Sequence, residues 1–110
     1  MNYRHQQAFL QAVTLARDEP NGFAAGEVMM VEAMWGSFDA EWSVFGFVVA
    51  LVTGRRVYLQ IIDDYGDAGH IEEALVLDML ASERVPSLQG LGAVKWHTDA
   101  LPELNELIAA

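Results

Sequence analysis

The 110-residue chain is predicted to fold as an α+β domain, with N-terminal helices packed on a three- to four-stranded antiparallel sheet and a short C-terminal helix. Three observations predict this class. Apolar residues recur at helical spacing near both chain ends, two β-branched runs lie in the middle with a short glycine turn between them, and further strand patterns follow directly. Helices gathered on one side of an antiparallel meander form such a layered fold. We expect residues 1–110 to form a single domain.

The N-terminal part of the chain is predicted to hold two helices. Tyr3–Asp18 has apolar residues at helical spacing, and Pro20-Asn21-Gly22 ends this helix because proline cannot continue it and Asn-Gly favours a turn. Phe23–Trp35 is expected to be the second helix. Its apolar residues show the i, i+3, i+7 spacing of one helix face: Val28, Val31 and Trp35. A strand over Val28–Met34 is the alternative.

The middle of the chain predicts an antiparallel hairpin. Ser43–Thr53 and Val57–Asp63 are rich in β-branched and aromatic residues, and the short Thr53-Gly54-Arg55-Arg56 segment between them is typical of a turn. Both faces of the first strand are apolar, so we expect it to be central and covered on both sides. Gly46, inside this strand, is expected to mark a bulge or a close approach of another group.

The C-terminal part is predicted to complete the sheet and add one helix. Glu73–Leu80 alternates and is interpreted as a third strand, and Ala93–Thr98 is interpreted as a short strand at a sheet edge. A last helix begins after Asp99, with Pro102 in its first turn. The second apolar face of the sheet would be covered by this helix, by curling of the sheet, or by a second copy of the chain in a two-fold dimer.

Composition narrows the classes of partner. The chain has 16 acidic and 6 basic residues and a formal net charge of −10, which argues against direct nucleic acid binding and leaves a basic protein partner open. Its apolar fraction of 53% favours self-association, so a homo-oligomer, most simply a dimer, is expected. The longest apolar run, Val44–Val52, falls short of the roughly 20 residues that a membrane span needs. With no cysteine and no signal peptide pattern, a cytoplasmic location is expected.

Two groups of residues are candidates for a functional site. One is a pocket or interface rich in aromatic side chains: Trp35, Trp42, Phe47, Asp78, Trp96 and His97. The other is an acidic loop: Asp63, Asp64, Asp67 and His70. The calcium-loop template fails in this loop because Ala68 stands where glycine is required, so no metal and no cofactor are predicted. Each group also has a purely structural interpretation. The aromatic group would then lie at an ordinary edge of the core, and the acidic residues would lie in a solvated connection between two strands.

The segment Trp42–Asp64 resembles small uncharacterised bacterial proteins that carry the signature W-x3-G-F-V-x2-L-x2-G-R-R-x-Y-L. In those proteins the hairpin is followed by a third strand, a turn and a tryptophan-bearing strand, which would correspond here to Glu73–Leu80, Pro86–Gly90 and Trp96. The resemblance implies no activity and no site residue. Arg55 and Arg56 of the signature are expected to form structural salt bridges with the acidic loop.

No sequence motif fixes a reaction, so several functions stay open. A non-enzymatic binding or adaptor protein that acts as a homo-oligomer is favoured, because apolar and aromatic residues are abundant and catalytic motifs are missing from the sequence. The alternatives are a small enzyme or ligand carrier with a pocket between helices and sheet, and an acidic mimic or inhibitor of a basic, nucleic-acid-binding partner.

Overall fold

A computed structural model describes residues 3–38, 42–64, 74–80, 96–97 and 101–109 of the chain. Its elements in chain order are α1 (Tyr3–Ala16), the 3-10 turn η1 (Ala25–Glu27), β1 (Val28–Phe38), β2 (Trp42–Leu51), β3 (Arg56–Asp64), β4 (Ala74–Asp78), β5 (Trp96–His97) and α2 (Leu101–Ala109). The predicted α+β class, with an N-terminal helix, an antiparallel sheet and a short C-terminal helix, is confirmed. Neither α1 nor α2 has the length and apolar character needed to cross a lipid bilayer.

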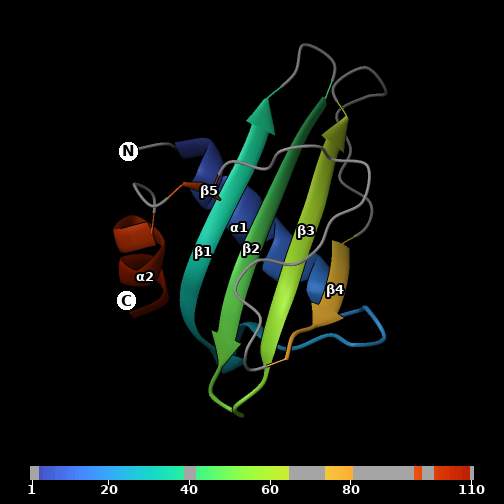
Figure 1. The fold of residues 1–110 in the computed structure, drawn as a ribbon, viewed down its shortest axis with the longest axis vertical. Coiled ribbons are helices and arrows are strands. Elements are labelled where there is room, and N and C mark those ends of the chain that lie inside the picture. The colour runs from blue at the N-terminus through green and yellow to red at the C-terminus, as the bar shows by residue number, and fades with distance from the viewer. Residues whose placement is uncertain (1–2, 39–41, 65–73, 81–95, 98–100, 110) are drawn as a thin grey trace.

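The five strands form one antiparallel sheet in the order β4-β3-β2-β1-β5. Figure 1 shows α1 crossing behind β2 and β3, and both views show α2 beside β1 at the edge of the sheet. The core between α1 and the sheet includes two aromatic contacts. The Phe9 ring meets Phe47 edge-on at a centroid distance of 5.3 Å, and the His5 ring meets Phe45 at 5.9 Å. The helix is therefore fixed to the central strand over two of its turns.

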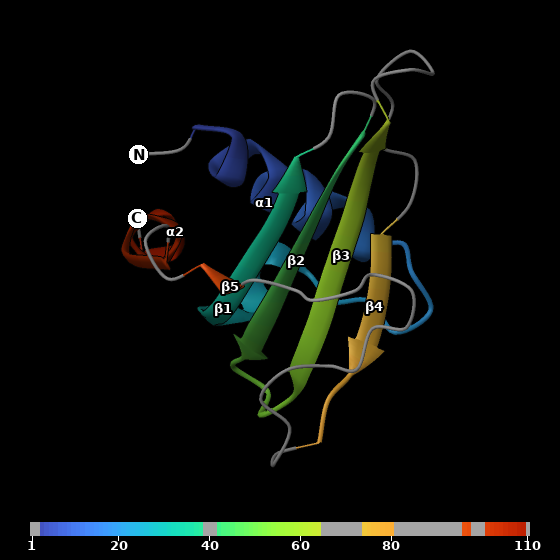
Figure 2. The same ribbon diagram turned by 45° about the horizontal axis from the view of Figure 1, so that its top comes forward.

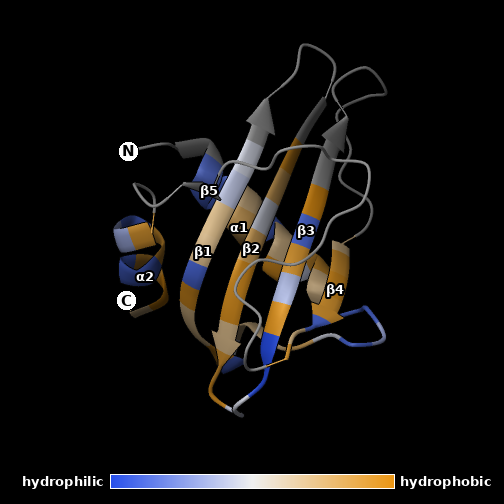
Figure 3. Ribbon diagram, in the orientation of Figure 1, coloured by the Kyte–Doolittle hydropathy of each residue, from blue (hydrophilic) through white to orange (hydrophobic). Residues whose placement is uncertain are grey.

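The predicted central hairpin is confirmed. Residues 44–50 of β2 are all buried, and Figure 3 shows hydrophobic residues along most of this strand. The turn holds Gly54 at φ +95°, a conformation that glycine adopts without the steric penalty of a side chain. Its amide donates to the Leu51 carbonyl, and the Leu51 amide donates to the Arg55 carbonyl. This pattern closes the hairpin and aligns β2 with β3.

The expected second helix over residues 23–35 is wrong, because this segment forms η1 and most of β1. Two irregularities in the β1–β2 pairing explain the error. The register shifts between Val28 and Met30 and again between Val31 and Ala33, and each shift places one extra residue on β1. Val28, Val31 and Met34 therefore all face α1 at a spacing of three. Two bulges in a strand thus imitate the apolar period of a helix.

The second face of the sheet carries its own buried cluster: Trp35, Val44, Val48 and Tyr58. Each of these side chains is at most 3% exposed. The prediction that both faces of β2 are covered is therefore confirmed, and one copy of the chain suffices to bury the centre of this face. At the β4 end of the same face, Leu75 and Leu77 stay more than 40% exposed.

The β1 edge of the sheet is closed by α2. The Val31 amide donates to Asn105 Oδ1 at 2.9 Å, and Asn105 Nδ2 donates to the Val31 carbonyl at 3.2 Å. The side-chain amide thus replaces the backbone of a neighbouring strand at this position. Further along the same edge, β5 pairs with Met34 and Trp35, so the predicted edge strand over Ala93–Thr98 is confirmed at residues 96–97, and its other residues lie outside the described part of the chain.

Candidate binding surfaces

A hydrogen-bonded array crosses the second face of the sheet. Trp35 Nε1 donates to the Tyr58 hydroxyl at 2.9 Å, and that hydroxyl donates to Gln60 Oε1 at 2.7 Å. Trp35, Gly46 and Gln60 occupy one row across β1, β2 and β3, so the indole reaches Tyr58 over the glycine. A Cβ at position 46 would overlap Trp35 Nε1 and the Tyr58 hydroxyl. The predicted close approach at Gly46 is therefore confirmed.

This array is structural rather than reactive. Burial raises the pKa of the Tyr58 hydroxyl well above its usual value, and the hydrogen bond from Trp35 opposes that rise only in part. The hydroxyl stays protonated at neutral pH, and both its donor and its acceptor capacity are used inside the fold. It is therefore unsuited to acid–base chemistry near pH 7.

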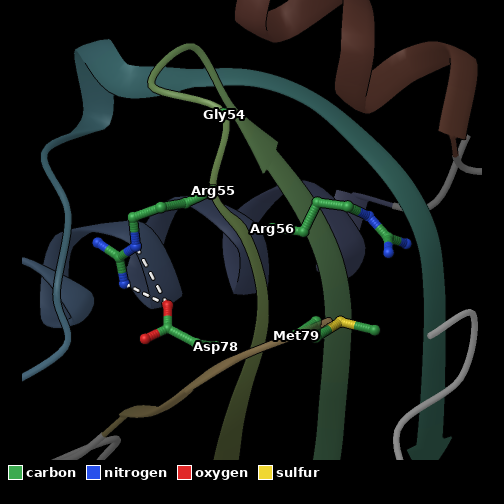
Figure 4. Close-up of a pocket in the computed structure, with 5 residues that line it drawn as sticks. All are labelled: Gly54, Arg55, Arg56, Asp78 and Met79. Carbon is green, nitrogen blue, oxygen red and sulfur yellow. Dashed lines mark hydrogen bonds and ion pairs between the residues drawn. The ribbon is translucent and has the colours of Figure 1, made fainter. Parts of the chain in front are cut away.

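A shallow cavity of about 370 Å³ lies beside the β2–β3 turn (Figure 4). It is lined by Gly54, Arg55, Arg56, Asp78 and Met79, and Figure 4 shows the two arginines pointing away from each other. Arg55 Nη2 lies 2.7 Å from Asp78 Oδ1, and its Nε donates to the same oxygen at 3.1 Å. The Arg55 guanidinium also donates to the carbonyls of Asn21 and Gly22. Arg55 thus ties the loop after α1 to the end of β4.

The second arginine of the turn lies on the opposite side. Arg56 Nε is 2.7 Å from Glu32 Oε2, and both side chains are largely buried, with exposed fractions of 16% and 26%. Arg56 Nη1 also donates to the Leu80 carbonyl at 3.2 Å. Because both arginines are held by carboxylates and carbonyls, the cavity has little positive charge left for an anion. The expected salt bridges form, but among the described residues their partners are Asp78 and Glu32 rather than the acidic loop.

An apolar groove of about 300 Å³ separates α1 from α2 and is closed below by the start of β1. It is lined by Phe9, Leu10, Val13, Thr14, Ala25, Gly26, Val28, Leu107 and Ile108. None of these nine side chains is charged, and the Thr14 hydroxyl donates to the Leu10 carbonyl at 2.8 Å. The groove therefore presents methyl, methylene and aromatic groups. Its size is at the lower end of ordinary ligand pockets.

A second hollow lies on the outer face of α1 and adjoins this groove. It is a shallow, open space of about 510 Å³, and the described residues that line it are Gln7, Leu10, Gln11, Thr14 and Leu15. Leu10 and Thr14 line both spaces, and Leu10 is 51% exposed on the ridge between them. Leu10 is thus an exposed apolar side chain between two hollows whose described lining residues carry no charge.

The candidate pocket residues do not form a single site. Trp35 and Phe47 belong to separate buried clusters on opposite faces of the sheet. Asp78 ends β4 at one edge, whereas Trp96 and His97 form β5 at the other. Trp42 begins β2 and pairs with Asp64 of β3. The pocket between helices and sheet that the structure does contain is lined by other residues, those of the α1–α2 groove.

Two residues of the predicted acidic loop lie in a strand. Asp63 and Asp64 belong to β3, where they pair with Ser43 and Trp42, so the strand extends through them. Asp67 and His70 lie outside the described residues. Within the described part of the chain, no group of three or more His, Cys, Asp or Glu side chains is placed to hold a metal ion.

Comparisons of the chain with protein-family models, curated proteins and solved structures find no match. The functional interpretation therefore depends on the geometry of the groove, the outer face of α1 and the charge of the chain.

Proposed function

We propose that this protein is a non-enzymatic binding protein, active as a homo-oligomer, that holds an apolar side chain of a partner polypeptide in the α1–α2 groove. The observation that carries the proposal is the groove itself: nine lining residues without a charge, beside an exposed Leu10. Apolar anchor side chains that enter such hollows supply most of the affinity of many protein contacts. The net charge of −10 favours a partner whose anchor is flanked by basic residues.

Two observations favour this function over the alternatives. An enzyme with its site between helices and sheet would need a titratable group there, and the nine groove residues include none. An acidic mimic would need free carboxylates on one face. Three described carboxylates are already engaged, since Glu32 and Asp78 are held by arginines and Glu27 accepts a hydrogen bond from the Ala24 amide at 2.7 Å. Fewer charges are then left for such a face, among them that of Asp18, whose side chain is 82% exposed.

A neutral environment-sensitive dye, Nile red, tests the groove directly. The wild-type protein is expected to bind the dye and raise its fluorescence. Gly26→Trp is expected to weaken this binding by about tenfold or more, because Gly26 lines the groove and a Cβ at this position meets nothing within 4 Å, so a bulky side chain added there competes with the dye for the same space. Leu77→Trp is the matched control, since Leu77 is 41% exposed on β4 and lies on the opposite face of the sheet. Equal binding by the wild type and Gly26→Trp, or no binding by the wild type, would rule the groove out.

A further inference from the structure

We propose that the outer face of α1 is the contact between two copies of this chain, with Leu10 of each copy packed into the hollow on α1 of the other. This inference rests on the homo-oligomeric state proposed above and assigns the surface that forms it. The occupant of the 510 Å³ hollow is thus a second copy, related to the first by a two-fold axis that passes near Leu10 and Gln11.

The spacing of the exposed residues on α1 fits helix-to-helix packing. Gln7, Leu10, Gln11 and Thr14 stand at i, i+3, i+4 and i+7, the four positions that surround one hole on a helix surface. Leu10 is both a member of this hole and the apolar side chain that projects beside it. One surface therefore offers a knob and a hole together, which is what an interface between identical patches requires.

The distribution of charge selects a second copy rather than an unrelated partner. Residues 5–16 contain no Asp, Glu, Lys or Arg, although the chain has 16 acidic and 6 basic residues. Two chains of net charge −10 repel each other, and they meet at least cost where neither carries a carboxylate. The five described residues that line the hollow on this outer face include no carboxylate to pair with the basic flanks of the partner proposed for the groove. The uncharged face of α1 is therefore suited to self-association of an acidic chain.

The other exposed apolar positions lie in different surroundings. At the β1 edge, Asn105 already satisfies the Val31 backbone. Met29 and Met30 are exposed at the start of β1, but the acidic residues Glu27 and Glu32 stand on either side of them in the chain. Leu75 and Leu77 are exposed on β4, and the carboxylate of the next residue, Asp78, is held by Arg55 on the opposite face of the sheet. The α1 contact leaves the adjoining α1–α2 groove at the seam, where the second copy adds to its wall.

Sedimentation equilibrium of the full chain tests the assigned face. The wild type is expected to be a dimer, and Leu10→Glu is expected to raise its dissociation constant by about 100-fold or more, since the change removes two buried leucines and adds two charges per dimer. Leu77→Glu, which places the same change on β4, is expected to leave the dimer intact. Raising NaCl from about 50 mM to about 500 mM is expected to strengthen association, because salt screens the repulsion between the two acidic chains.

Cross-linking gives an independent readout. Because the chain has no cysteine, a single Leu10→Cys substitution forms a disulfide only between copies, and it is expected to give a covalent dimer under mild oxidation. Leu77→Cys, on the opposite face of the sheet, is expected to stay uncross-linked at the same concentration.

The outcomes separate the two proposals. A dimer that survives Leu10→Glu, or that dissociates in Leu77→Glu, would overturn the α1 contact while leaving the homo-oligomeric state intact. A wild type that is monomeric at about 100 µM would overturn both the contact and the oligomeric state. In that case the Nile red titration would still decide whether the groove binds.

Discussion

The glycine in the centre of β2 gives the sharpest test of the packing on the second face. A methyl group at Gly46 would overlap Trp35 Nε1 and the Tyr58 hydroxyl and would lie 2.6 Å from Trp35 Cε2. Both rings are buried, with exposed fractions of 3% and 0%. To restore ordinary carbon contacts near 3.5 Å, the indole has to move by roughly 1 Å. That movement breaks the Trp35–Tyr58 hydrogen bond.

The expected loss of stability in Gly46→Ala follows from these contacts. Overpacking of a tight core costs about 1–3 kcal/mol. A buried donor left without its acceptor costs a further amount of about 1–3 kcal/mol. The smaller entropy of the unfolded alanine chain offsets about 0.4–1 kcal/mol. We expect a net destabilisation of about 2–4 kcal/mol, a large part of the roughly 5–15 kcal/mol that stabilises a typical domain.

Urea unfolding followed by tryptophan fluorescence measures this loss. A double-mutant cycle with Tyr58→Phe isolates its cause, because removal of the hydroxyl removes one of the atoms that the new methyl group would meet. Gly46→Ala is therefore expected to cost less in the Tyr58→Phe background than in the wild type. A loss below about 0.5 kcal/mol in the wild type, or equal losses in both backgrounds, would refute the proposed contact between the rings and position 46.

The remaining predictions concern the ion pairs, the sheet edge and pH. Glu32→Gln is expected to destabilise the fold by about 1–3 kcal/mol and Asp78→Asn by less than about 1 kcal/mol, because the Arg56–Glu32 pair is largely buried and the Arg55–Asp78 pair is not. Urea unfolding of both variants under the same conditions checks which loses more stability. Asn105→Ala removes the hydrogen-bond partner of the Val31 amide and of the Val31 carbonyl, so it is expected to destabilise the fold by about 1–2 kcal/mol and to speed hydrogen exchange of the Val31 amide. An unchanged exchange rate of this amide would contradict the contact. Since the folded-state pKa of Tyr58 is raised, its contribution to stability persists below pH 10 and falls above it by at most about 1.4 kcal/mol per pH unit; unfolding from pH 8 to 11 should show a shallower decline in Tyr58→Phe.

The spacing of apolar residues correctly predicted the elements whose spacing is regular along their whole length. It failed in β1, where bulges interrupt the regular alternation of the strand. β2 and β3 alternate without interruption, so their faces were readable from the sequence. In β1, two bulges place Val28, Val31 and Met34 on one face at a spacing of three. A strand with bulges and a short helix then have similar patterns. The register that separates them is set by pairing with β2, which lies outside the local sequence.

The proposed contact surface on α1 has a feature in the sequence that the spacing of apolar residues does not reveal. The absence of charge over residues 5–16 of an acidic chain is visible in the sequence, and it holds for the outer face of this helix as well as for its buried face. The groove was not predictable because Leu107 and Ile108 reach it from the other end of the chain. Likewise, Arg55 and Arg56 were recognised as salt-bridge residues, but their partners depend on how β1 and β4 align with the turn.

The central claim is that the α1–α2 side of the molecule, rather than the second face of the sheet, contacts its partners. Amide NMR spectra of the isotope-labelled chain, recorded with and without Nile red, test it most directly. We expect shifts confined to the groove, at Val13, Gly26, Leu107 and their neighbours. Shifts centred on Leu75 and Leu77 would contradict it, because they would show that the exposed apolar end of the opposite face binds instead.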